Sequence, residues 1–163
     1  MEQGNLVYGL VGGLTIALLI AAFTDLTRRR IYNWLNLGIA LCAPLFWWAS
    51  GLDLLSIAMQ LVLAVSVFAL LSLFFALGLM GGGDVKLLSA LALWLPWQPF
   101  LKLIVMMALV GGLVTILFAA WHVVNRRKDR LQVPYGIAIA AAGLWVISTT
   151  YAPPHVLIGS LSG

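Results

Sequence analysis

Long apolar runs, each near the length of a membrane-spanning helix, fill most of this 163-residue chain. A helix needs roughly 20 predominantly apolar residues to cross a bilayer. Of the residues here, 63% are hydrophobic and 9% are charged, whereas a soluble domain carries about 25% charged residues. The chain is therefore expected to be an all-α, polytopic membrane protein, with a single domain over residues 1–163.

The apolar runs predict six spans joined by short polar or turn-forming connections. The spans are Leu6–Phe23, Leu35–Ala49, Leu54–Leu79, Val85–Leu95, Phe100–Trp121 and Tyr135–Tyr151. The connections are Asp25–Asn33, Ser50–Asp53, Gly81–Asp84, Pro96–Pro99 and Asn125–Pro134. The fourth span would cover only about 16 Å of a roughly 30 Å hydrocarbon core. We therefore expect its inner end to be recessed beside a water-filled cavity.

Basic residues gather on one side of this six-span arrangement. Because cytoplasmic loops carry the excess of Lys and Arg, that side should be cytoplasmic and both termini should lie outside. Lys102 alone falls on the other side, and the inner residues are Arg28, Arg29, Arg30, Lys86, Arg126, Arg127, Lys128 and Arg130. Topology and lipid headgroups account for the net charge of +4, so membrane lipid is an expected partner and nucleic acid is not.

Two other residue types limit the possible chemistry and test the spans. Cys42 is the only cysteine, so the chain can form neither an internal disulfide nor a Cys-rich zinc site, and we expect no metal and no cofactor. Most tryptophans fall near predicted span ends, where interfacial aromatic belts place them. These are Trp34, Trp47, Trp48, Trp94, Trp97 and Trp121.

The carboxylates leave two candidates for chemistry. The chain has five, namely Glu2, Asp25, Asp53, Asp84 and Asp129. Glu2 and Asp53 fall on the outer side, and Asp129 lies within a basic loop. Asp25 and Asp84 both lie at the inner membrane border, although they are far apart in sequence.

Two aspartates that approach each other can hydrolyse a peptide without a metal. Like charges at short range cannot both ionise, so the pair shares one proton and titrates as a unit. One carboxylate then takes a proton from the attacking water, while the other hydrogen-bonds the scissile carbonyl and later protonates the leaving amine. Glycines beside Asp84 would let a substrate strand approach closely or allow left-handed backbone.

Simpler roles remain open for each residue. Asp84 suits the N-cap of the next helix, and Asp25 can be a solvated partner of Arg28 and Arg29. Gly81–Gly83 can be a flexible turn, and Lys86 can extend to the interface. A different functional class also remains, since intramembrane carboxylates serve ion carriers and proton relays.

Three segments together resemble the prepilin peptidases, which are intramembrane aspartyl proteases of the Gly-x-Gly-Asp type. Gly81-Gly82-Gly83-Asp84-Val85-Lys86 matches the motif with the second catalytic aspartate of that family. Asp25, followed after five residues by Ile31-Tyr32-Asn33, matches the first motif, which ends in Ile-Pro-Asn. Pro134-Tyr135-Gly136 is similar to the segment that opens the last helix.

The resemblance implies catalytic roles for Asp25 and Asp84. It implies substrate-binding or site-shaping roles for Gly81, Gly82, Gly83, Lys86, Asn33, Pro134, Tyr135 and Gly136. The implied substrate is a pilin-like precursor, and the implied location is a prokaryotic plasma membrane. Tyr32 replaces the usual Pro, which is expected to loosen the loop after Asp25. The cysteine-paired methyltransferase region of larger members is missing, so we expect a protease-only form.

Overall fold

Helices make up the fold of the part of the chain that the structure describes. This computed structural model describes residues 2–124 and 135–151, with side chains for 4–116 and 135–151. The helices are α1 (Glu2–Arg28), α2 (Asn33–Ala49), α3 (Leu54–Ala76), α4 (Gly82–Ala92), α5 (Trp97–Val124) and α6 (Tyr135–Tyr151). Within these ranges no strand is present, so the all-α prediction is confirmed.

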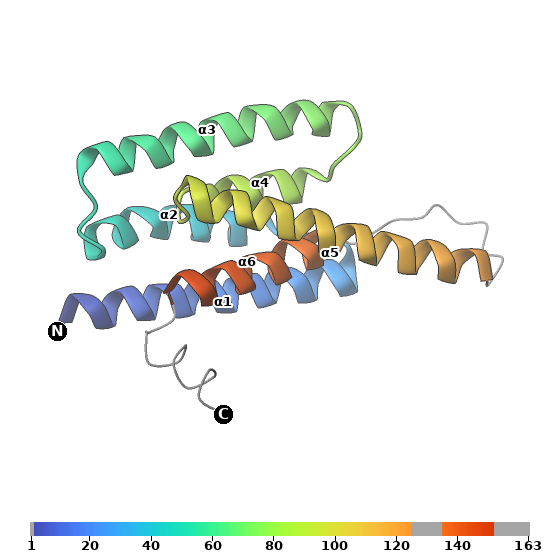
Figure 1. The fold of residues 1–163 in the computed structure, drawn as a ribbon, viewed down its shortest axis with the longest axis horizontal. Helices are drawn as coiled ribbons and strands as arrows, with labels where there is room; N and C mark the ends of the chain where they lie inside the picture. The colour runs from blue at the N-terminus through green and yellow to red at the C-terminus, as the bar shows by residue number, and fades with distance from the viewer. Residues whose placement is uncertain (1, 125–134, 152–163) are drawn as a thin grey trace.

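The helices run up and down beside one another in a flat bundle (Figure 1). α1 and α6 form one side, α3 forms the other, and the short α4 lies between them (Figure 1). α4 packs against α2, α3, α5 and α6. Its side chains belong to the core, and Leu87, Leu88 and Leu91 are fully buried.

Three helices have the length and composition to cross a membrane. They cover Gly4–Arg28, Leu54–Ala76 and Trp97–Ile116. α3 buries only three of its 23 residues, Gln60, Ala64 and Leu71, and exposes Leu, Val and Phe along the rest. So large an exposed apolar surface is rare on soluble monomers. The chain is a membrane protein.

Two helices end at glycines with left-handed backbone. Gly51 and Gly78 have φ values of 64° and 72°. After α3, the backbone N–H of Leu79 donates to Phe74 and that of Gly78 donates to Phe75, a Schellman motif. α3 therefore ends at Ala76, before the predicted span end at Leu79.

Several helices begin earlier or end later than the apolar runs suggested. α1 continues to Arg28, so Asp25 is helical and does not lie in the connection assigned to it from sequence. The hydroxyls of Thr24 and Thr27 donate to carbonyls of the preceding turn, so both polar side chains are hydrogen-bonded within the helix. α4 begins at Gly82 and ends at Ala92, about one turn earlier than the predicted span.

Two tryptophans lie in the core and not in an interfacial belt. Trp94 and Trp47 are buried, with 2% and 8% of their surface exposed. The Trp47 indole donates to the carbonyl of Leu93, and the Trp94 indole donates to that of Ile39. The Tyr151 hydroxyl donates to the Trp94 carbonyl. The interfacial prediction is wrong for Trp47 and Trp94, because their N–H groups bond carbonyls inside the bundle.

Candidate active site

The first turn of α4 holds Asp84 against its own helix start. Gly81 is the N-cap, with φ −73° and ψ 140°, and Asp84 is the third residue of the helix. The Asp84 carboxyl group reaches back to the backbone N–H of Gly81, as the third residue of a capping box does. The expected N-cap role thus belongs to Gly81, and Asp84 supplies the cap from inside the helix.

Asp25 lies one turn before the end of α1 and faces the beginning of α6. It is buried, with 8% of its surface exposed. The backbone N–H groups of Gly136 and Ile137 face its carboxylate, and the positive end of α6 favours an anion there. The Oδ2 atom of Asp25 is buried and has no hydrogen-bond partner among the described residues. This carboxylate therefore has one acceptor available for a proton or a water molecule.

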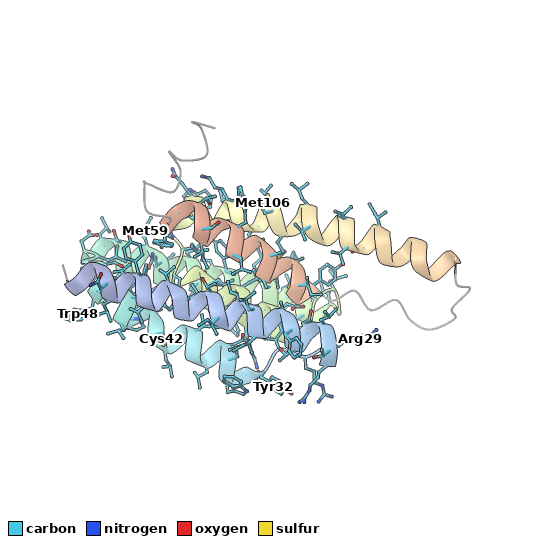
Figure 2. The ribbon with its side chains drawn as sticks, turned by 90° about the horizontal axis from the view of Figure 1, so that it is seen from below. Arg29, Tyr32, Cys42, Trp48, Met59 and Met106 are labelled. Atoms are coloured by element: carbon cyan, nitrogen blue, oxygen red, sulfur yellow. The ribbon has the colours of Figure 1, made fainter. Side chains whose placement is uncertain are left out.

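The fold brings the two aspartates to the same end of the bundle. The negative charge of Asp25 acts on the Asp84 carboxyl group. Ile31 from the α1–α2 connection packs against Gly83, the residue before Asp84, where an added Cβ would lie 3.1 Å from the Ile31 Cβ. Arg29 and Tyr32 mark this end in Figure 2, and Trp48 marks the opposite end.

Close packing accounts for the glycine run. A Cβ on Gly81 would lie 2.9 Å from the Oδ2 atom of Asp84, and one on Gly82 would lie 3.2 Å from the ring of Phe75. Neither Gly81 nor its two successors has a positive φ. These glycines do not use the left-handed backbone that glycine permits, and the lack of space for a side chain gives a steric reason for them. Their role in letting a substrate strand approach stays a prediction.

Lys86 and Asn33 form a separate polar pair. The Lys86 Nζ donates to the Asn33 Oδ1 at 2.8 Å, and both side chains are exposed. At 3.6 residues per turn, Lys86 points about 160° away from Asp84 around α4. The structure therefore groups these two predicted site residues with each other and not with the aspartates.

Tyr32 occupies the position of the expected proline with a proline-like φ. Its φ of −72° lies within the range that a proline ring imposes, about −65 ± 15°. The Arg28 Nη1 donates to its hydroxyl at 2.6 Å, and its ring stacks on Trp34. The connection after Asp25 is thus held by side-chain contacts in place of a ring.

The last motif is only partly described. Pro134 lies outside the described residues. Gly136 is buried in the first turn of α6, and a Cβ there would lie 2.7 Å from Oδ2 of Asp25. Tyr135 lies beside Gly111 of α5, where an added Cβ would be 3.7 Å from its ring. Gly136 therefore belongs to the site, and Tyr135 flanks it.

Asn36 is a site residue that sequence reasoning missed. It is buried, with 4% of its surface exposed, and its Nδ2 donates to the carbonyl of Gly83 at 3.2 Å. A polar residue inside an apolar run, three positions after Asn33, was the available signal. Among the described residues, no group of three or more His, Cys, Asp and Glu side chains is placed to hold a metal ion.

The sequence pattern of the type IV leader peptidase family matches residues 13–117. The chain belongs to this family. It is 30% identical to a prepilin leader peptidase/N-methyltransferase of Aeromonas hydrophila over 144 residues, covering 82% of this chain and 46% of that protein.

Two further relatives of the type IV leader peptidase family carry the same name. The protein of Aeromonas salmonicida strain A449 is 31% identical, with the same coverage. That of Burkholderia pseudomallei strain 1026b is 40% identical over 63 residues, covering 39% of this chain and 19% of the relative. The chain thus spans less than half the length of these curated relatives. No solved structure matches it.

Proposed function

We propose that this chain is an aspartic endopeptidase that removes the leader from type IV pilin-like precursors. The observation that carries the proposal is the placement of Asp25 and Asp84 at one end of the bundle, where the charge of one acts on the other. Membership of the type IV leader peptidase family supports this reaction class. The printed names of the relatives support a prepilin substrate.

In the proposed mechanism the pair shares one proton. Asp25 acts as the base, since the amides at the start of α6 partly offset the burial that disfavours its anion, whereas both burial and the charge of Asp25 disfavour an anion at Asp84. It takes a proton from a water molecule as the water oxygen attacks the scissile carbonyl carbon. Asp84 hydrogen-bonds the carbonyl oxygen and protonates the amine as the C–N bond breaks. Peptide hydrolysis by two carboxyl groups and a water molecule needs no metal or cofactor.

The proposed membrane arrangement has six spans, both termini outside and the aspartates at the cytoplasmic face of a prokaryotic plasma membrane. Arg28, Arg29 and Arg30 follow within five residues of Asp25, and basic residues mark cytoplasmic connections. The apolar helix of the precursor would then lie in the bilayer while its leader reaches the aspartates from the cytoplasm. Residues 1–163 would form a single transmembrane peptidase domain.

The test is cleavage of a purified precursor by Asp25→Asn and Asp84→Asn in reconstituted vesicles. Each variant should lose roughly 10²- to 10⁴-fold in rate, because an amide neither takes nor gives the proton. Asp53→Asn is the matched control at the other end of the bundle. Its carboxylate caps α3 by accepting from the N–H of Ser56, and Asn can also cap, so its rate should stay normal. Near-normal cleavage by either site variant refutes the assignment.

An ion or proton carrier is the competing function. Such a protein would need polar groups along a path through the bundle. Among the described residues, the other buried polar side chains are Asn36 and Gln60. Vesicle flux that depends on Asp84, without cleavage, would favour the carrier.

A further inference from the structure

A groove between α2, α3 and α4 opens on the lipid-facing side of the bundle. It has a volume of about 570 Å³. Its polar end is formed by the first turns of α2 and α4, with Asn33, Asn36 and Lys86. Its long wall is apolar and comes mainly from α3, where Leu61, Ala64, Val65 and Phe68 line it. We call it the inner groove.

The inner groove is separate from the aspartates. On α4 and its C-cap it is lined by Lys86, Ser89, Ala90 and Leu93. At 3.6 residues per turn, these four lie within about 60° of the point opposite Asp84. A molecule in the groove would therefore contact the far side of α4 and would not touch the catalytic pair.

One acceptor at the polar end of the groove has no donor. The Oδ1 of Asn36 is buried and has no partner within the described part of the chain. Buried acceptors are nearly always paired, so this atom calls for an N–H or O–H group from outside. Beside it, the Lys86 Nζ adds a positive charge and donors beyond the one that Asn33 accepts. The missing ligand thus combines an anion, a donor and an apolar body.

We propose that the inner groove binds an anionic phospholipid whose headgroup carries a hydroxyl, as in phosphatidylglycerol. The phosphate pairs with Lys86, the hydroxyl donates to Asn36, and an acyl chain lies along α3. Basic pockets between membrane helices on the cytoplasmic side bind anionic headgroups in this way. The apolar helix of a precursor fits less well, because its positive N-terminal end and basic leader would face Lys86.

Asn36 connects this lipid to the catalytic loop. Asn36 lines the groove, and its Nδ2 donates to the carbonyl of Gly83, the residue before Asp84. A bound headgroup therefore fixes the Asn36 amide and, through it, the start of α4. This second step rests on the proposed function, whereas lipid binding itself does not.

The experiment measures photocrosslinking of labelled phosphatidylglycerol to the full chain in phosphatidylcholine vesicles. Val65→Trp fills the groove, and Val62→Trp places the same ring on the same helix outside it. Both valines are largely exposed, at 67% and 63%, so neither change disturbs the core. Lys86→Gln should lower crosslinking about fivefold or more, since one basic residue near the surface contributes about 1 kcal/mol. Val65→Trp should lower it by a similar factor, because its ring occupies the space of the acyl chain. Val62→Trp should leave it unchanged.

Three outcomes would overturn the lipid site. Equal crosslinking of the two tryptophan variants would show that the groove is not used. Equal crosslinking of labelled phosphatidylcholine would show that the negative charge of the lipid is not needed for binding. Displacement of the lipid by a synthetic precursor would assign the groove to substrate. Asp84→Asn should bind the lipid normally, so loss of the proposed enzyme activity and loss of the lipid site are distinguishable.

Discussion

The glycines around the two aspartates occupy positions where a Cβ would collide with a neighbour. Gly81 lies against Asp84, Gly83 lies against Ile31, and Gly136 lies against Asp25. The tightest of these contacts is at Gly136, where an added Cβ would lie 2.7 Å, 2.8 Å and 2.9 Å from three atoms of the Asp25 side chain. The size of this glycine therefore sets where the carboxylate can lie.

Gly136→Ala should displace the Asp25 carboxyl group and stop most cleavage. The added methyl group cannot be accommodated at under 3 Å, and a misplacement of about 1 Å can cost roughly 10²-fold in rate. The measurement is the rate of precursor cleavage in vesicles, together with the melting temperature of the purified protein. The cleavage rate should fall strongly, whereas the melting temperature should fall only slightly.

Gly111→Ala is the matched control for Gly136→Ala. Gly111 lies in α5 against the same first turn of α6, but a Cβ there would be 3.6 Å from Ala138, an ordinary contact. Its cleavage rate should stay within about twofold of normal, since a fitting Ala costs little. Similar losses in both variants would show that the first turn of α6, and not the position of Asp25, limits the reaction.

At the scale of single residues, the sequence predicted the parts of the site that depend on local motifs. Asp84, Gly136 and their neighbours could be named because motif order and spacing carry them. Asn36 could not, since its role depends on a hydrogen bond to Gly83, 47 positions away. Lys86 lies beside Asp84 in sequence, yet helix geometry turns it to the other side of α4.

At the scale of helices, apolar runs indicated where the helices are but not where they end. Hydropathy fades at Phe23, while the α1 hydrogen bonds continue to Arg28. A run that stays apolar to Leu79 is stopped by the left-handed backbone at Gly78. A count of apolar residues therefore cannot predict the helix ends that hydrogen bonds and φ angles determine.

The C-terminal end of α4 should be weakened by Trp47→Phe. The Trp47 indole donates to the carbonyl of Leu93, which has no partner within its own short helix. Loss of the N–H leaves a partly buried acceptor unpaired, at a cost of about 1 kcal/mol. Thermal or denaturant unfolding in detergent should show a stability loss of this size.

Trp48→Phe is the neighbouring control for Trp47→Phe. Trp48 is 66% exposed on the outer surface of α2, whereas Trp47 is buried. Its stability should change by no more than about 0.5 kcal/mol, as for other surface substitutions. Equal losses in the two variants would mean that the bond to Leu93 contributes nothing to holding α4.

At the scale of the whole molecule, alternation of spans was enough to predict that Asp25 and Asp84 lie at one end. Each up-and-down helix reverses the chain, so the ends of α1 and α3 and the start of α4 lie at the same end of the bundle (Figure 1). What alternation could not predict is which helix lies at the centre. α4 lies there because its leucines pack against four other helices, a long-range result.

The proposed orientation makes a prediction for labelling from one side of the membrane. In a Cys42→Ser background, Ser50→Cys marks the α2–α3 connection and Arg30→Cys marks the α1–α2 connection, and both positions are exposed. Basic residues favour the cytoplasm, so an impermeant maleimide applied to right-side-out vesicles should label Ser50→Cys. Arg30→Cys should react only after the vesicles are permeabilised.

The reverse labelling pattern would have a direct consequence for the reaction. Arg30 follows Asp25 closely, at the same end as Asp84. If Arg30→Cys reacted from outside, the aspartates would face the extracytoplasmic space, where a basic cytoplasmic leader could not reach them. Cleavage would then require the precursor to cross the membrane first. The labelling experiment therefore decides whether the carboxylates meet the leader before or after translocation.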